Sequence, residues 1–571
     1  MNTMNFKNII CGVCAVCGLY ACADWDDHYD ADTAVLGSQQ NTLWQNIAKD
    51  DGLTQFAAML KKVGYDNELS MSKSYTVWAP KNGTFDIASL ESATDSALLK
   101  DFIQNHITQA NVLASGRVDD QRVLMLNKKS MLFAGDGNYT IQGVELETFN
   151  IACSNGTIHK TNGFIPYLRN IDELLYDESY AVDSIRKYFE QYRVEKLDKE
   201  KSVPGPTLNG EITYLDSIIE ERNDLHKLYN AYLNREDSNY TMVLPTNKAW
   251  QKASEKIATY FNYLSKFSMY TVSPSGKDST ASIQLRDAEQ LKDSMVNFYL
   301  THDLFYNNNL FDNGKLGNHS TESRFECDSL ISTLHTKIYS EDAAALMEGV
   351  QRIDCSNGVV YLTDDSLRMR PWSSWNPEIK IEAETQGRLI KTDFTEPQRI
   401  QVPVGSQNPL VAGHLSGNAY FEAKPSLVGA HPDLYFSLPS IRSTTYGIYL
   451  VIVPANIVNP KAECKPHQMR VVIGYADAKG SLKATTVSSA VTNEDGLEKI
   501  DTVYVGDFTF PVAYAGTGDD IYPYIRIRSN YKSDVAENRD DNLRIDCIIL
   551  RPKDLDDYLK EHKDYKYDCD R

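Results

Sequence analysis

One motif occurs twice in the chain, at Tyr75–Phe85 and at Tyr240–Trp250. Both copies begin with Tyr-Thr, have proline at the sixth position and asparagine at the eighth, and end on an aromatic residue. The pattern predicts a short buried strand that stops at the proline, followed by a helix that the asparagine caps and whose aromatic residue packs back on the strand. Because the two copies share their spacing, the chain is expected to contain one supersecondary unit twice.

The length of the chain predicts more than one domain. With 571 residues it is too long for a single core, and three or four domains are expected. The 58 basic and 78 acidic residues give a net charge of -20. This balance argues against nucleic acid as a partner, since its binding requires clustered lysines and arginines.

The N-terminal segment predicts export and lipid attachment. The apolar run Ile9–Ala21 follows Lys7 and is too short to span a bilayer as a mature helix. Its end, Leu19-Tyr20-Ala21-Cys22, resembles a bacterial lipobox, and the acidic residues that follow resemble the surface-export signal of Bacteroidetes lipoproteins. We expect a signal peptide at residues 1–21, lipid on Cys22 and a polar tether over 22–40. The alternative is an ordinary secretory signal in which Cys22 is incidental.

The cysteines do not form a recognisable framework. Six of the ten follow the predicted lipid site, and they contain no CxxC pair and no zinc-ligand spacing. Most are expected to be buried apolar residues, and the sequence leaves their disulfide state open. These six are Cys153, Cys327, Cys355, Cys464, Cys547 and Cys569.

The first copy of the motif lies in a segment with a helical N-terminal half and a β-rich second half. After the motif come Asn105-His106-Ile107 and then Cys153–His159, which contains an Asn-Gly turn signal. This order resembles the fasciclin domain, and the resemblance covers residues 41–175. It implies an α+β fold that serves as an adhesion or binding module.

The second copy repeats the same order after a charged linker or helix at residues 176–210. His302 fills the central histidine position, and Cys355–Tyr361 repeats Cys-Ser-Asn-Gly. A second fasciclin-like domain is therefore expected over 211–370. Tyr361 replaces His159, so a function peculiar to that histidine cannot belong to both domains.

The hydrophobic pattern changes at residue 371, where short runs of alternating apolar and polar residues replace helical periodicity. Nine or ten such strands before residue 553 predict an antiparallel β-sandwich or jelly roll. The strands that contain Ile379–Glu384 and Asp546 distantly resemble carbohydrate-binding jelly rolls. A charged, helical or frayed tail is expected at 554–571. The predicted fold is thus multidomain, with two α+β fasciclin-like domains followed by the sandwich at 371–553.

Several residues suggest catalysis at first sight. His106 and His302 have equivalent predicted positions, and Cys153 precedes His159 as a nucleophile and base would. The family resemblance instead implies a hydrogen-bonded core histidine, and a cysteine in a strand is usually inert. The segment Gly413–Gly417 has the wrong spacing for a nucleophile elbow. We therefore predict no catalytic residues and no cofactor.

Oxygen-rich clusters are candidates for a calcium site. Glu382, Glu384 and Asp546 would form one if the jelly-roll resemblance holds. Asp519-Asp520 and Asp540-Asp541-Asn542 are alternatives. The favoured interpretation is that all are solvated loop carboxylates, so no metal is predicted.

Two tryptophans, Trp372 and Trp375, stand at the junction before the sandwich. Exposed, they could stack on a sugar or anchor a partner. Buried, they would join the two domains, and this second interpretation is favoured.

Together these features predict a non-enzymatic lipoprotein on the outer face of the outer membrane. Such lipoproteins accompany SusC/SusD-like TonB-dependent importers, which implies capture of a glycan or peptide or docking on the importer. A cell-surface adhesin is the alternative. A hydrolase with a site in the sandwich is a lesser one.

Overall fold

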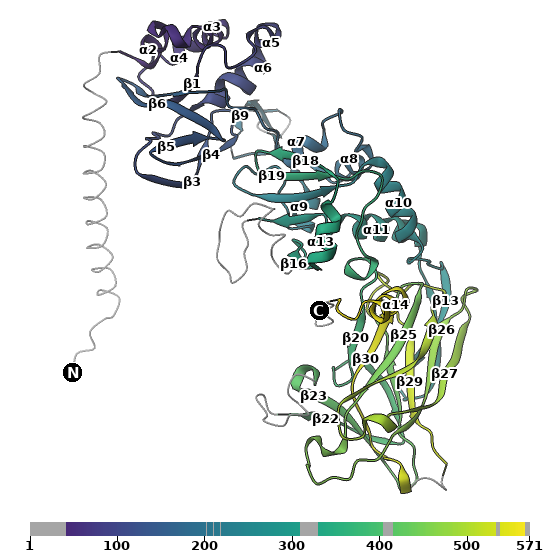
Figure 1. Ribbon diagram of the computed structural model, residues 1–571. Coiled ribbons are helices and arrows are strands. Elements are labelled where there is room, and N and C mark those ends of the chain that lie inside the picture. The colour runs from purple at the N-terminus through teal and green to yellow at the C-terminus, as the bar shows by residue number, and fades with distance from the viewer. Residues whose placement is uncertain are drawn as a thin grey trace, which may run out of the picture.

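The computed structural model describes most of the chain beyond the predicted tether. The predicted signal peptide, Cys22 and the tether lie outside the described residues, as does the end of the predicted tail. The described ranges are 41–200, 202–208, 211–216, 219–308, 329–402, 415–532 and 537–565. Figure 1 shows three regions that follow one another from the N-terminal helices to the C-terminal sheets.

The first region packs short helices against a seven-stranded sheet. Its sheet has the order β2-β1-β7-β6-β5-β4-β3, and its two edges are β2 and β3. The helices are α2 (Leu43–Lys49), α3 (Thr54–Lys62), α4 (Tyr65–Glu68), α5 (Ile87–Ser92) and α6 (Asp95–Ala97). The strands are β1 (Tyr75–Pro80), β2 (Ile107–Thr108), β3 (Arg117–Leu124), β4 (Ser130–Asp136), β5 (Asn138–Ile141), β6 (Val144–Cys153) and β7 (Gly156–Thr161).

The motif forms the buried strand β1, as predicted, and this strand lies between β2 and β7. All six of its residues are buried, and it pairs in parallel with β7, with Tyr75 opposite Gly156 and Trp78 opposite His159. The helical face of the sheet carries an apolar core that includes Phe56. The two sequence motifs of this region, Tyr75–Phe85 and Cys153–His159, therefore meet in the parallel strand pair β1–β7.

The second region repeats this arrangement in a four-stranded sheet of order β15-β12-β19-β18. Here β12 and β19 pair in parallel, with Tyr240 opposite Gly358 and Val243 opposite Tyr361. The strands are β12 (Tyr240–Leu244), β15 (Phe305–Asn307), β18 (Gln351–Cys355) and β19 (Gly358–Leu362). The helices are α7 (Ile171–Leu175), α8 (Asp183–Glu190), α9 (Asp224–Leu228), α10 (Asn247–Ala258), α11 (Ala288–Thr301) and α13 (Ser340–Met347).

The second region begins earlier in the chain than its sequence suggested. Helices α7 and α8 bury Leu175, Ile185 and Phe189 in the core of the second region. The boundary expected at residue 175 therefore lies before α7, and the predicted linker 176–210 supplies part of a core. Two two-stranded sheets follow α8, and the second is inserted between the strands of the first. They are β8 (Arg193–Leu197) with β11 (Ile219–Asn223), and β9 (Val203–Leu208) with β10 (Glu211–Asp216).

The motif asparagines do not cap the helices that follow them. Asn82 accepts a hydrogen bond from Gln55 N (2.9 Å) in the first turn of α3, and Asn247 accepts one from Ser184 N (2.9 Å) in α8. Both therefore cap a helix that precedes the motif. The helices after the motif begin with other caps, Asp86 before α5 and Thr246 before α10.

The C-terminal region consists of two antiparallel sheets that share one core. One sheet has the order β22-β23-β30-β25-β28, with β20 on β30, and the other has the order β21-β24-β29-β26-β27. Side chains of both sheets, such as Ile448 and Ile525, form the core between them. The strands are β20 (Ile379–Glu382), β21 (Leu389–Asp393), β22 (Thr395–Gln401), β23 (Ala419–Pro425), β24 (Asp433–Ser437), β25 (Thr445–Ile452), β26 (Gln468–Ala476), β27 (Leu482–Thr492), β28 (Asp501–Thr509), β29 (Tyr524–Ser529) and β30 (Leu543–Pro552).

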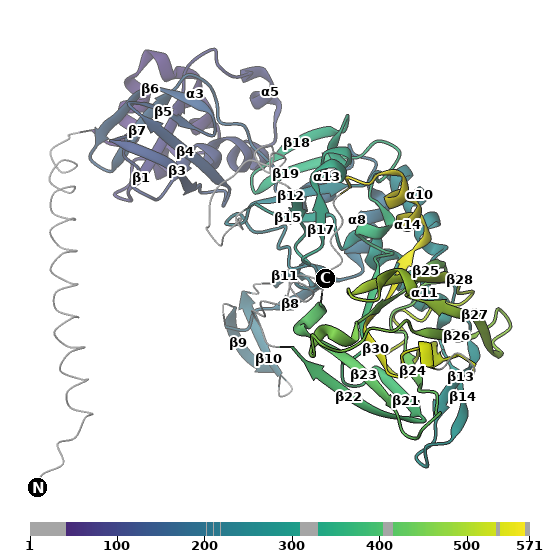
Figure 2. The same ribbon diagram turned by 60° about the horizontal axis from the view of Figure 1, so that its bottom comes forward.

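Two connections tie the second region to these sheets. The hairpin of β13 (Lys266–Val272) and β14 (Asp278–Gln284) lies beside β26 and β27 in both views (Figure 1, Figure 2), and its Phe267 enters the C-terminal core. The buried Arg442 donates to the carbonyl of Trp375 (3.0 Å) and to the Tyr299 hydroxyl (2.9 Å). Part of the predicted tail is helical, as α14 (Lys553–Glu561).

Candidate metal centre

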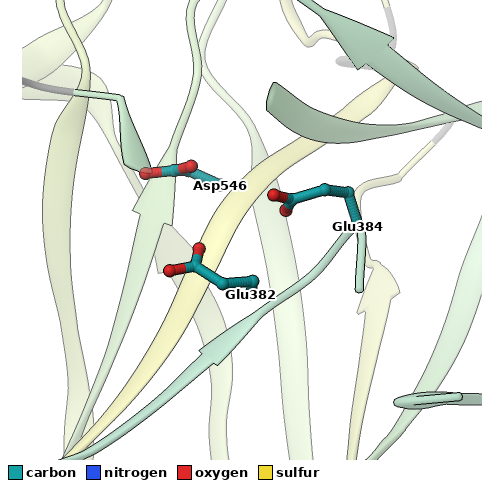
Figure 3. Close-up of side chains that lie close together, drawn as sticks. All are labelled: Glu382, Glu384 and Asp546. Carbon is teal, nitrogen blue, oxygen red and sulfur yellow. The ribbon is translucent and has the colours of Figure 1, made fainter. Parts of the chain in front are cut away.

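Three carboxylates of the C-terminal region converge, as Figure 3 shows. One oxygen from each of Glu382, Glu384 and Asp546 lies within 4.8 Å of the other two. Within the described part of the chain, this is the one group of three or more His, Cys, Asp or Glu side chains so placed.

Backbone geometry brings these side chains together. Glu382 ends β20, and Ala383 N donates to the carbonyl of Asp546 (2.9 Å), so the two strands continue side by side past Glu382. On the other flank of β30, Ile545 and Ile548 face Ile452 and Leu450 of β25 with one extra residue between them. Such a bulge re-aims a side chain, and Asp546 is one of the two residues inside it.

Ser416 and Lys380 complete the surroundings of the carboxylates. The Ser416 hydroxyl donates to Glu382 Oε1 (2.6 Å), and its backbone N–H donates to Asp546 Oδ2 (3.2 Å). Lys380 Nζ donates to the Ser416 hydroxyl (2.7 Å) and lies 3.4 Å from Glu382 Oε1. One cation is thus present beside three acidic groups.

The remaining oxygens of the cluster are buried without a partner. Asp546 is only 2% exposed. Its Oδ1, together with Oε2 of Glu382 and of Glu384, accepts no hydrogen bond from any described residue. Buried carboxylate oxygens are normally hydrogen-bonded or bound to a metal, because an uncompensated charge is costly in a protein interior.

Burial and mutual repulsion disfavour the charged forms of these groups. Burial, and then the neighbouring Glu382 and Glu384 charges, raise the pKa of Asp546 to about 7. Burial also raises the pKa of Glu384, and the nearby Glu382 charge adds to the effect. A cation bound between the three carboxylates would offset both the burial and the repulsion that disfavour their charged forms.

The donor set fits a hard, oxygen-preferring cation. Three carboxylates and the Ser416 hydroxyl offer oxygen ligands only, which suits calcium better than zinc. The favoured sequence interpretation, solvated loop carboxylates, is wrong for Asp546, because this residue lies inside a central strand. From the sequence, Ser416 was considered only within Gly413–Gly417, as part of a rejected nucleophile elbow, because its approach to the carboxylates depends on tertiary structure.

The other oxygen clusters of the sequence do not converge in this way. Asp540 Oδ2 accepts from Arg544 (2.6 Å), so that its charge is paired. Asp541 accepts a hydrogen bond from the Tyr531 hydroxyl. The part of Gly413–Gly417 before Leu415 lies outside the described residues.

The residues that suggested catalysis in the first region do not meet as a nucleophile and base would. Cys153 accepts a hydrogen bond from Asn46 Nδ2 (2.9 Å), and burial raises the pKa of its thiol. His159 donates from Nε2 to the Val112 carbonyl (2.9 Å) and accepts from Asn150 N (3.2 Å). Both ring nitrogens of this histidine are therefore occupied by backbone.

His106 and His302 do not occupy equivalent positions. In the first region Ile107 lies opposite Val77, and in the second Phe305 lies opposite Met242. Counted from these pairs, the residue that corresponds to His106 is Leu304. His106 is fully buried, donating from Nδ1 to the Phe102 carbonyl (2.7 Å) and accepting from Ile165 N (2.8 Å).

Trp372 and Trp375 are both buried, as the junction interpretation predicts. Trp372 packs on Tyr558 of α14 and donates to the Tyr565 hydroxyl (3.1 Å). Trp375 belongs to the core of the second region. Neither ring has a free face for a sugar.

The first region matches a known family. Residues 51–165 match the family model described as the Fasciclin domain. The chain contains a fasciclin domain. Among solved structures it is similar to a FAS1 domain pair from the insect cell adhesion molecule Fasciclin I, at 12% identity and a TM-score of 0.20, over 56% of this chain and 98% of that one.

A second group of solved structures aligns with about a third of the chain. A xylan-binding domain from CBM 22 has 12% identity and a TM-score of 0.19, over 30% of this chain and 93% of its own. The CBM22-1 xylan-binding domain from Paenibacillus barcinonensis has 11% identity and a TM-score of 0.18, over 30% and 94%. The search of curated proteins found no match.

Proposed function

We propose that this protein is a non-enzymatic binding protein with two tandem fasciclin-like domains and a C-terminal β-sandwich. The fasciclin domain at residues 51–165 carries the proposal, because such domains are adhesion and binding modules. The second domain is supported by its parallel pair β12–β19, which has the register of β1–β7. The sandwich is supported by the core that its two sheets share.

The surroundings of the carboxylates support binding rather than hydrolysis. Glycoside hydrolysis uses two carboxyl groups about 5 to 9.5 Å apart, with room for a sugar or water between them. The oxygens of Glu382, Glu384 and Asp546 lie closer together than that, within 4.8 Å, and Asp546 is buried. A structural calcium ion suits this geometry better than an acid and a base.

Lipid attachment at Cys22 would place the protein on the outer face of the outer membrane. The support is the lipobox-like sequence and the acidic residues after it. Among the helices that the structure describes, none has the length and apolar character that a membrane crossing requires. A SusC/SusD-like importer is the proposed partner, with a glycan or peptide as the captured ligand.

A detergent pull-down of the native protein tests this role. We expect the full chain to co-purify with an outer-membrane importer, and the Cys22→Ala variant to leave the membrane fraction. Recovery of a host or neighbouring-cell receptor instead would favour the adhesin alternative. Release of reducing sugar from polysaccharides, lost in Asp546→Asn, would favour the hydrolase and defeat the proposal.

Chelation tests the calcium ion separately. A ligand present at a hundred times its dissociation constant stabilises the folded state by about 2.7 kcal/mol. We expect EDTA to lower the melting temperature of the C-terminal region and added calcium to restore it. Asp546→Asn should abolish this response, whereas Asp540→Asn, which alters a carboxylate paired with Arg544, should keep it. An identical melting curve with and without EDTA would exclude the ion.

A further inference from the structure

A second site, away from the carboxylates, lies between the first region and the second. A cavity of about 420 Å³ is bounded on one side by β3 and β4 and on the other by β18 and β19. These elements lie beside one another in both views (Figure 1, Figure 2). The volume is within the range of small-molecule sites, which often form where two domains meet.

One wall of the cavity carries an arginine without an acidic partner. Arg122 donates to the backbone carbonyl of Glu236 (3.3 Å), and no described carboxylate lies within ion-pair distance of its guanidinium. The carboxylate of Glu236 itself is engaged by Lys129 (2.9 Å). Burial lowers the pKa of Arg122, although Glu236 and Asp237 partly oppose the shift. An anion in the cavity would stabilise this desolvated charge.

The opposite wall offers a buried hydroxyl that the protein leaves unused. Ser356 is 8% exposed, and its Oγ has no hydrogen-bond partner among the described residues. Among the described residues of the lining, the one acidic residue is Asp354, which accepts two hydrogen bonds from Arg352 (3.0 and 2.9 Å). The negative charge on this wall is therefore already paired.

The remaining lining combines amides with aliphatic side chains. Gln142 and Asn239 contribute amides, and Leu132 and Val359 contribute apolar surface. Amides pair with hydroxyl groups, whereas the arginine requires a negative charge. We propose that the cavity binds a small anionic sugar, with its charged group at Arg122 and a hydroxyl at Ser356. This assignment extends the proposed function to a separate site and does not depend on the calcium ion.

Calorimetric titration of the full chain with glucuronate, glucose 6-phosphate and glucose tests the assignment. We expect at least one of the two anionic sugars to bind and glucose not to bind. Preference for glucuronate would assign a carboxylate ligand, and preference for glucose 6-phosphate a phosphate ligand. The absence of binding by both anionic sugars at tens of millimolar would overturn the proposal.

Matched variants locate the binding. Arg122→Gln should weaken it about tenfold or more, the usual effect of losing a hydrogen bond to a charged group. Ser356→Ala, on the opposite wall, should weaken it severalfold, and it tests the site even if Arg122→Gln fails to fold. Arg117→Gln, in the same strand but exposed and paired with Asp119, should bind as the parent does. Equal affinity in all three variants would place the anion elsewhere and refute the assignment.

Discussion

The fasciclin domain in the first region and the second region hold their parallel strand pairs in the same way. Asn155 accepts from Leu43 N (2.7 Å) and donates to the carbonyls of Leu69 (2.9 Å) and Met71 (2.7 Å). Asn357 makes the corresponding set of hydrogen bonds in the second region. It accepts from Ile171 N (2.9 Å) and donates to the carbonyls of Leu233 (2.6 Å) and Arg235 (3.1 Å).

The two regions differ in the side chains that fill the core. His159, beside Trp78 in the first region, is replaced by Tyr361 beside Val243 in the second, and His106 is replaced by Leu304. The asparagines that hold the strand pairs are thus shared, whereas the two histidines, which also form hydrogen bonds with buried backbone groups in the first region, are not.

The largest effect is expected where the strand pairs leave no room for a side chain. A Cβ on Gly156 would lie 1.9 Å from the Tyr75 carbonyl oxygen, and one on Gly358 would lie 1.8 Å from that of Tyr240. Both glycines also have positive φ, +147° and +145°. Gly156→Ala and Gly358→Ala should each cost more than about 4 kcal/mol and unfold the region that contains the change. Hydrogen exchange read by mass spectrometry resolves the two regions.

A turn glycine provides the control for this first prediction. Gly137 has φ +83°, and a Cβ added to it would meet no other atom within 4 Å. Gly137→Ala should therefore cost only the strain of about 1 to 2 kcal/mol. If one of the two strand glycines tolerated alanine as Gly137 does, the two regions would not share their strand geometry.

The next effect concerns the two asparagines. Asn155→Ala and Asn357→Ala each remove three hydrogen bonds to backbone groups, at a cost of about 3 kcal/mol. Thermal unfolding with region-resolved exchange should show similar losses, in the first region for Asn155 and in the second for Asn357. If only one of the two variants lost stability, the two asparagines would not have equivalent roles. Asn138→Ala, at the exposed first residue of β5, should change little.

The exchanged histidines predict a difference in acid stability. Burial lowers the pKa of His106 and of His159 to about 4, whereas an unfolded histidine titrates near 6.5. Each histidine has a lower pKa in the folded protein than in the unfolded chain. Its contribution to the free energy of unfolding is therefore complete above the unfolded pKa and is lost as pH falls from about 6.5 toward 4. At pH 5 each histidine should cost the first region about 2 kcal/mol.

Exchange at pH 7 and pH 5 measures this difference. Protection should fall more in the first region than in the second, where Leu304 and Tyr361 hold the corresponding positions. His106→Leu should reduce the pH dependence of the first region, even if it lowers stability at pH 7. Equal loss of protection in both regions would contradict the assignment of acid sensitivity to these histidines.

The sequence was sufficient where the signal is local and insufficient where partners are distant. Tyr75–Pro80 and the Asn-Gly turn at Asn155 were predicted correctly, because a buried strand and a tight turn depend on neighbouring residues. The start of the second region was not predicted correctly, because what places Ile171 in that region is its hydrogen bond to the distant Asn357. The cluster of Glu382 and Asp546 was a candidate only through the jelly-roll resemblance, because periodicity cannot reveal the strand pairing that brings the two residues together.

The smallest effect tests which helix the motif asparagine caps. Asn247→Ala removes the bond from Ser184 N and should cost about 1 kcal/mol, as is usual for a helix cap. Exchange should then rise at the start of α8, while α10 stays protected because Thr246 accepts from Ala249 N.

Asn82→Ala should give the matching result in the first region, with faster exchange at the start of α3, where Gln55 N loses its acceptor. Asp86→Ala is the opposite control, since it removes the cap of α5 and should leave α3 unchanged. For Asn247→Ala, faster hydrogen exchange in α10 rather than in α8 would restore the sequence-based interpretation, in which the asparagine caps the helix that follows. The geometry predicts the reverse in both regions, because each motif asparagine folds back onto a helix that precedes its strand.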